Sequence, residues 1–190
     1  RQMCIRDSST YCEKLPQFLL YALVIQVGLN LGANAELGKM VKDIRFSSLL
    51  LPFFTIIGTL VFSAAASLLL TSWNIYDCMA VGSGFAYYSL SSLLIVQLKE
   101  ASAGIEIASQ LGAIALLANI IREMLALFGA PLYASFFGKF APVSVAGINS
   151  MDVCLPVISR YSGKSIVPVA IIHGIILEIS VPLLISLFCK

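Results

Sequence analysis

The chain is 190 residues long, with 59% hydrophobic residues, 12% charged residues and a mean hydropathy of +0.94. Soluble domains carry about 25% charged residues, so this composition excludes an ordinary soluble globular protein and predicts a polytopic, all-α membrane protein in a lipid bilayer. The net charge of +2, without a basic run, excludes nucleic acid as a partner.

The front of the chain differs from the rest. Residues 1–12 lack an initiator Met and an apolar segment, and they resemble translated adapter sequence. We therefore expect residues 1–12 to be a non-native leader. Residues 13–190 are expected to form one transmembrane transporter domain that is truncated at its front.

Apolar windows long enough to cross about 30 Å of hydrocarbon follow one another along the chain. They predict about six spans in this fragment, over residues 16–31, 48–70, 75–98, 103–137, 142–158 and 165–188. If every window is one crossing, the loops 33–47, 99–102 and 160–164 share a side and carry six Lys and Arg residues, against three on the opposite side. The positive-inside rule then places these loops in the cytoplasm and both ends of the fragment outside.

The window 75–98 is interrupted by Gly82-Ser83-Gly84, which lowers helix propensity twice within three residues. Unwound backbone at membrane depth is tolerated where it lines a cavity or is buried in protein. We expect a discontinuous helix in which Ser83, Gly84, Tyr87 and Ser89 contact a substrate. A small-residue helix-packing face is the alternative. The pair Tyr87-Tyr88 could stack against a cation or belong to an interfacial aromatic belt.

A second polar group, in the window 103–137, contains Asn119, Arg122 and Glu123. Asn119 and Glu123 are four residues apart and share one face of a helix, which we expect to point into the cavity. Arg122 is expected to pair with another acid or to extend to a membrane boundary. Local neutralisation of Arg122 by Glu123 is the alternative, although adjacent helical side chains do not face each other well.

The strongest functional candidate is Asp152, which follows Asn149 and Ser150 inside an apolar window. A carboxylate at membrane depth costs about 2.5–3.5 kcal/mol and normally faces a water-filled cavity or a cation. Pro156 has no N–H, so the carbonyl of Asp152 is expected to be free to coordinate an ammonium or a proton. The alternative is that Asp152 caps a half-helix that starts near residue 153.

His173 is the lone histidine of the chain and lies in the last window. It is interpreted either as a structural hydrogen-bonding residue or as a proton relay. Glu178, five residues later, lies off the same helical stripe, and we expect only a minor role for it.

Other classes of function find little support. The five cysteines have no Cys-x-x-Cys spacing, so we expect no metal site and no cofactor. The His-Glu-x-x-His pattern of metalloproteases and the paired acids of intramembrane aspartyl proteases are missing from this sequence. The protein is therefore not expected to be an enzyme.

Four motifs, taken in order, give the chain a specific resemblance. They are Gly82-Ser83-Gly84-Phe85-Ala86-Tyr87-Tyr88-Ser89-Leu90-Ser91, Asn119 to Glu123 with Leu125-Ala126, Asn149-Ser150-Met151-Asp152 with Leu155-Pro156-Val157, and Val167-Pro168-Val169-Ala170-Ile171-Ile172-His173-Gly174. From about residue 16 to its carboxyl end, the chain resembles the LysO-type lysine exporter family.

The resemblance implies a multi-pass protein of the bacterial inner membrane that exports L-lysine and toxic lysine analogues. It also implies further spans before this fragment and a dependence on intramembrane acids, of which Asp152 is the one carried over; an acidic counterpart is expected in the front half. The expected mechanism is alternating-access secondary transport, coupled to protons or another ion through that acid. The alternative is a channel or a structural membrane subunit without carrier activity.

A cationic amino acid imposes two demands on such a site. The side-chain ammonium needs at least one carboxylate, which Asp152 and Glu123 are expected to supply. The substrate carboxylate needs hydrogen-bond donors, which are expected from Ser83, Ser89 and the backbone amides near Gly84.

Overall fold

A computed structural model describes residues 46–70 and 72–189. Every regular element in these ranges is helical, which confirms the all-α prediction. The elements are α3 (Phe46–Ala66), α4 (Ile75–Gly82), α5 (Tyr88–Ala103), α6 (Ile105–Phe137), α7 (Ala141–Ala146), η1 (Gly147–Met151), α8 (Leu155–Ser162), η2 (Lys164–Ile166) and α9 (Val167–Phe188). The predicted leader and the predicted span 16–31 lie outside the described residues.

Two segments of the described chain are long and apolar enough to cross a bilayer, the helix α6 and the run Lys164–Phe188 that contains α9. The 33 residues of α6 correspond to about 50 Å at a rise of about 1.5 Å per residue. The helix α3 is also apolar and has 21 residues, or about 31 Å. These helices match the predicted spans 103–137, 165–188 and 48–70.

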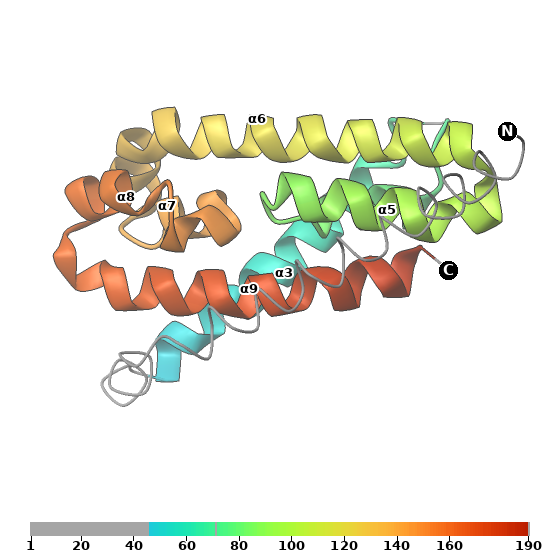
Figure 1. Ribbon diagram of the computed structural model, residues 1–190. Coiled ribbons are helices and arrows are strands. Elements are labelled where there is room, and N and C mark those ends of the chain that lie inside the picture. Colours follow the sequence, from blue (N-terminus) through green and yellow to red (C-terminus); the bar gives the residue numbers. More distant parts are fainter. Residues whose placement is uncertain (1–45, 71, 190) are drawn as a thin grey trace, which may run out of the picture. The chain divides into compact units, whose positions relative to one another are not determined.

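The predicted span 75–98 is not one crossing but a hairpin of two antiparallel helices. Phe85 and Ala86 adopt positive φ angles of 44° and 73°, which reverse the chain between α4 and α5. An ion pair of 2.6 Å between Lys99 Nζ and Asp77 Oδ1 then joins the last part of α5 to the first turn of α4. Both arms therefore open at the same end of the bundle, where α6 begins (Figure 1).

The predicted span 142–158 is a second hairpin, and it enters from the opposite end. Its inward arm is α7 followed by η1, and its return arm is α8. Figure 1 shows α7 and α8 together at the end where α6 finishes and α9 starts. The described residues thus contain three long helices and two short hairpins, and the prediction that all five of these windows cross a membrane is not confirmed.

The two hairpins give the described part an internal repetition that the sequence did not reveal. A hairpin followed by a long helix occurs twice, as α4–α5–α6 and as α7–α8–α9. The helices α6 and α9 run in opposite directions along the bundle (Figure 1). This is the arrangement of an inverted-topology repeat, in which the two units enter a membrane from opposite faces.

The hairpins also change the distribution of charge that the sequence predicted. Lys99 lies near the end of α5, whereas Arg160 and Lys164 lie near the end of α8. Figure 1 places these two helix ends at opposite ends of the bundle. The predicted grouping of the loop 99–102 with the loop 160–164 on one side is therefore wrong.

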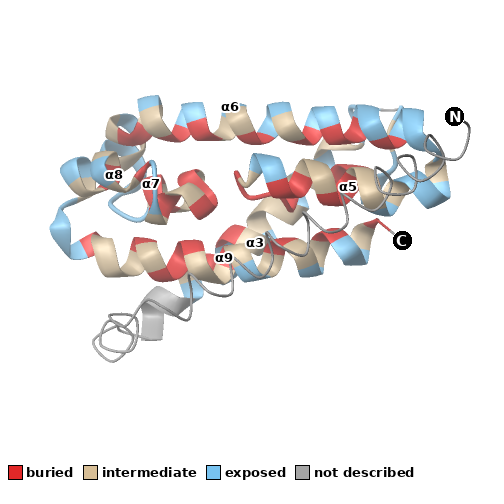
Figure 2. Ribbon diagram, in the orientation of Figure 1, coloured by how far each residue is buried: buried red, intermediate tan, exposed pale blue. Residues whose placement is uncertain are grey.

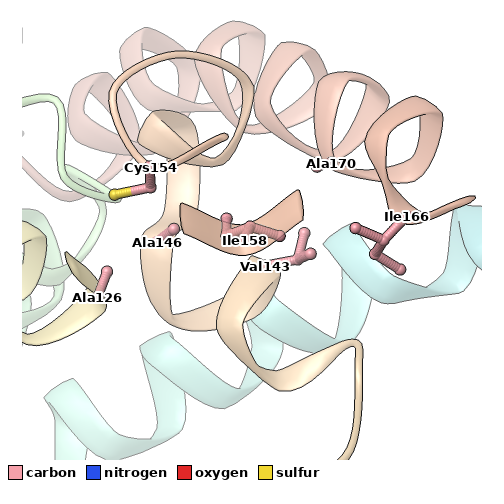
Figure 3. Packing of buried hydrophobic residues seen from close by; sticks show 7 residues of the cluster. All are labelled: Ala126, Val143, Ala146, Cys154, Ile158, Ile166 and Ala170. Carbon is pink, nitrogen blue, oxygen red and sulfur yellow. The ribbon is translucent and has the colours of Figure 1, made fainter. Parts of the chain in front are cut away.

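Small and branched side chains pack the second hairpin against the long helices. The cluster consists of Ala126 from α6, Val143 and Ala146 from α7, Cys154 and Ile158 at α8, and Ile166 and Ala170 at α9 (Figure 3). Small residues allow helix backbones to approach closely, as is common in membrane interiors. Figure 2 shows the buried positions on the inward stripes of α6 and α9 and at the tips of both hairpins.

Candidate functional site

The tips of the two hairpins meet inside the bundle and are joined by their backbones. The amide of Ile148 donates a hydrogen bond of 3.0 Å to the carbonyl of Phe85. Asn149 Nδ2 donates a longer one, of 3.5 Å, to the carbonyl of Ala86. Gly147 has a φ of +62°, and a Cβ there would collide with the Phe85 carbonyl, so only glycine permits this approach.

Asn119 of α6 holds the first tip. Its Oδ1 accepts a hydrogen bond of 2.7 Å from the amide of Ala86, and its Nδ2 donates to Ser91 Oγ at 3.1 Å and to the carbonyl of Ala115 at 2.8 Å. A Cβ at Gly84 would collide with the Asn119 side chain. Asn119 and Gly84 thus stabilise a reversed tip with positive φ angles, and the predicted contact of either residue with a substrate stays a prediction.

Arg122, one turn further along α6, holds the second hairpin. Its Nε donates to the carbonyl of Val145 at 2.9 Å and its Nη2 to the carbonyl of Ser144 at 3.0 Å. These carbonyls lie at the end of α7, where the helix dipole favours a cation. The guanidinium also lies 5.7 Å from the centre of the Phe85 ring. Within the described ranges Arg122 has no acidic partner at ion-pair distance, so the predicted pairing with an acid is not found there.

His173 belongs to a buried polar network that joins α3, α7, η1 and α9. Its Nε2 lies 3.0 Å from Thr55 Oγ1 and its Nδ1 lies 3.3 Å from Ser150 Oγ. Thr55 Oγ1 lies 2.9 Å from Ser144 Oγ, and Ser150 Oγ donates to the carbonyl of Ala170 at 2.9 Å. Both ring nitrogens therefore have partners, as the structural interpretation of His173 requires. Ser150 is used in the same way.

Asp152 lies in the turn between η1 and α8, and it is exposed. The expectation of a freed carbonyl is wrong, because the Asp152 carbonyl accepts a hydrogen bond of 3.0 Å from the amide of Leu155. The capping alternative also fails, since Cys154 is the residue that precedes α8. The backbone of Asp152 is thus satisfied by the turn, and the exposed carboxylate is the group that remains for a ligand.

Helix α9 passes the second tip, because a Cβ added at Gly174 would collide with the carbonyl of Ile148. Glu178 lies one turn further along α9 and is half-buried. Glu123 is buried on α6, and Tyr87 is half-buried just before α5. A contact of Glu123 or Tyr87 with a substrate stays a prediction, as does the minor role expected for Glu178.

Ser83 and Ser89 do not share one environment. Ser83 is fully buried, and its hydroxyl donates to the carbonyl of Met79 at 2.7 Å within α4. Ser89 is exposed in the first turn of α5. The structure therefore gives Ser83 a local role at a helix end, whereas Ser89 stays available to solvent or a ligand.

A cavity of about 230 Å³ lies between α3, α4 and α6. Its wall includes Thr59, Ser63, Gly82, Asn119 and Arg122, and the remainder is largely apolar. Asp152 does not line this cavity. Thr59 and Ser63 were not predicted as site residues, because a hydroxyl in an apolar helix most often bonds its own backbone and carries no distinctive signal.

Comparison with known proteins identifies the family of the chain. The family model described as "Lysine exporter LysO" matches residues 2–189. "Lysine exporter LysO" of Escherichia coli K12 is 28% identical over 180 residues, which is 94% of this chain and 56% of that protein. A Haemophilus influenzae protein named "Putative lysine exporter" is 28% identical over 171 residues, or 90% of this chain and 82% of its own length.

The chain thus spans about half the length of its Escherichia coli relative. No solved structure matches it. Because the family model covers nearly all of the residues, the chain belongs to the lysine exporter LysO family.

Proposed function

We propose that the protein exports L-lysine and related cationic amino acids across the bacterial inner membrane. The observation that carries this proposal is the meeting of two oppositely directed hairpins, with the exposed carboxylate of Asp152 on the turn of one of them. The names of the relatives support lysine as the cargo.

The hairpin tips have the features that a carrier site needs. Irregular backbone at membrane depth is stable where it is buried in protein or lines a cavity. The tips bring the ends of α4 and α7 and the starts of α5 and α8 into the interior of one bundle. Transporters built from inverted repeats place substrate sites at such helix breaks, and rocking of one unit against the other exposes them alternately.

Asp152 is proposed as the receptor for the cationic group of the substrate. Its carboxylate has no hydrogen bond or ion pair within the described ranges, and an unpaired intramembrane carboxylate is expensive unless water or a cation reaches it. A lysine ammonium would satisfy it. Protonation of the carboxylate would also neutralise its charge. Because a proton and a lysine ammonium compete for the same oxygen atoms, proton movement is coupled to lysine export.

The proposed orientation follows from the basic residues at the two ends of the bundle. The connections at one end carry Lys139, Arg160 and Lys164, and all three lie outside the long helices. At the other end, Lys99 is neutralised by Asp77. The positive-inside rule therefore assigns the end with Lys139, Arg160 and Lys164 to the cytoplasm.

Efflux from proteoliposomes tests the proposal. The protein, expressed from its complete open reading frame, is reconstituted with labelled lysine inside, and its efflux is compared with that of Asp152→Asn and Glu106→Gln. Glu106 is an exposed acid in the first turn of α6, far along the helix from the tips, and serves as the matched control. We expect Asp152→Asn to fall to the background of empty liposomes and Glu106→Gln to retain wild-type efflux.

The same experiment separates a carrier from a channel. Carrier efflux saturates with lysine and accelerates when unlabelled lysine is present on the opposite side, whereas efflux through a channel does neither. Full efflux by Asp152→Asn would contradict the role given to this acid.

A further inference from the structure

The cavity between α3, α4 and α6 has no role in the mechanism above. It is lined by Thr59, Ser63 and Arg122, and a more open groove of about 840 Å³ is lined by the same three residues. The acids Asp152, Glu123 and Glu178 line neither space. The polar part of the wall therefore contains a cation and two hydroxyl groups, whereas the turn at Asp152 carries a negative charge.

Arg122 has N–H groups that are not used in its hydrogen bonds to the second hairpin. A guanidinium carries five N–H groups, and the two hydrogen bonds to the end of α7 use Nε and Nη2. No carboxylate of the described residues is within ion-pair distance of it. A cation held among apolar helices is costly without an anionic partner. The remaining N–H groups thus call for an anion that enters from the cavity.

We propose that this cavity binds a small anion through Arg122, Thr59 and Ser63. The guanidinium fork matches a carboxylate, and the two hydroxyls, one turn apart on α3, can donate to the same group. One source of the carboxylate is the exported amino acid itself, a case that rests on the proposed function. The other source is a free anion such as chloride or acetate.

Trp73 provides a readout that does not depend on transport. It is the single tryptophan of this sequence and lines the same cavity. The purified protein, expressed from its complete open reading frame, is titrated with acetate and with chloride at constant ionic strength, using a bulky organosulfonate as the balancing anion. We expect a saturable change in tryptophan fluorescence that is lost in Trp73→Phe, which assigns the signal to this residue.

Two kinds of variant separate anion binding from the structural role of Arg122. Arg122→Gln removes the charge but also weakens the hold on α7. Thr59→Val and Ser63→Ala leave that hold intact and remove only the hydroxyls. A hydrogen bond to a charged group contributes about 1.5–3 kcal/mol, so we expect each hydroxyl variant to bind acetate more weakly than wild type by about tenfold or more. Arg122→Gln should show no saturable change in fluorescence.

Transport then identifies the source of the anion. Lysine efflux is compared with efflux of 1,5-diaminopentane, which has both amines of lysine and no carboxylate. If wild type prefers lysine and Arg122→Gln loses the preference, the substrate carboxylate occupies the cavity. If chloride stimulates both cargoes equally in wild type and neither in Arg122→Gln, a free anion occupies it.

The proposal is overturned if wild type shows no saturable anion-dependent change at Trp73, or if the hydroxyl variants and Arg122→Gln all bind as wild type does. Lysine export without any anion effect would remove this inference and leave the proposed function standing. An anion-dependent change at Trp73 in a protein that exports no lysine would support this inference and contradict the proposed function.

Discussion

Asn119 and Arg122 lie three residues apart on α6, and each holds the tip of a different hairpin. Asn119 accepts from the amide of Ala86 in the first tip, and Arg122 donates to the carbonyls of Ser144 and Val145 at the end of α7. One turn of one helix therefore fixes both breaks. Any motion that separates the two repeats has to act across this turn, so we expect it to be the pivot of the proposed alternating-access motion.

Asn119→Ala tests the hold on the first tip. The substitution leaves the buried amide of Ala86 without its acceptor and removes the amide donor from the hydroxyl of Ser91. A buried polar group that loses its partner costs about 1–3 kcal/mol, so we expect a lower midpoint of thermal unfolding in detergent. Ser109→Ala, at an exposed position on the same helix, should unfold like wild type. Equal midpoints for the two variants would show that Asn119 does not stabilise the tip.

Gly147→Ala tests the contact between the tips. Two effects would destabilise the alanine variant: the positive φ of 62°, and the collision of the added Cβ with the carbonyl of Phe85. Gly138 offers a matched control, because its φ is 87° and nothing lies within 4 Å of an added Cβ. A non-glycine residue held in such a sparsely populated backbone region costs about 1–3 kcal/mol. We expect Gly147→Ala to lose that amount and the tip contact as well, and therefore to unfold at a lower temperature than Gly138→Ala.

Similar losses for the two glycine variants would mean that the tips can separate without cost. Gly58→Ala completes the series. Gly58 lies inside α3 with open space around it, and alanine in a helix interior is more stable than glycine by about 0.5–1 kcal/mol. That variant should be as stable as wild type or slightly more so.

His173→Gln separates a structural histidine from a proton relay. Glutamine keeps a donor and an acceptor near Thr55 and Ser150 but cannot titrate in the neutral range. A structural role predicts some loss of stability and an unchanged pH profile of lysine efflux. His173→Ala should lose more stability, since Thr55 and Ser150 each lose one hydrogen-bond partner and the missing imidazole leaves a buried cavity. A flattened pH profile in His173→Gln would instead show that the imidazole carries protons.

Much of this fold was predictable from hydropathy and from a few breaks in it. The apolar runs identify α3, α6 and α9, because a long helix needs little beyond an apolar stretch without interruptions. The positions of the breaks were also correct, since a pair of glycines in one window and an acid followed by a proline in another disfavour a continuous helix. The direction of the chain after each break was not predictable.

A broken helix that continues and a hairpin that returns have nearly the same local sequence. What decides between them here is the positive φ of Phe85 and Ala86, and neither residue type favours that conformation. The conformation is imposed by partners distant in the sequence, Asn119 and Ile148. The same limit applies to the site. Asn119 and Arg122 line a cavity, but the sequence alone gave no sign that they also bind the backbones of the two hairpins.

The direction of the hairpins can be tested with cysteine labelling in intact cells. The hairpin requires residues 72 and 102, before α4 and near the end of α5, to face the same side of the membrane, whereas a crossing helix would place them on opposite sides. In a background in which the native cysteines have been replaced, we expect Ser72→Cys and Ser102→Cys both to react with a membrane-impermeant maleimide added outside. Lys139→Cys and Arg160→Cys, which are exposed at the other end of the bundle, should react only after the cells are permeabilised. Protection of one of the two serine positions and labelling of the other would restore a crossing at residues 75–98 and remove the inverted repeat on which the transport mechanism depends.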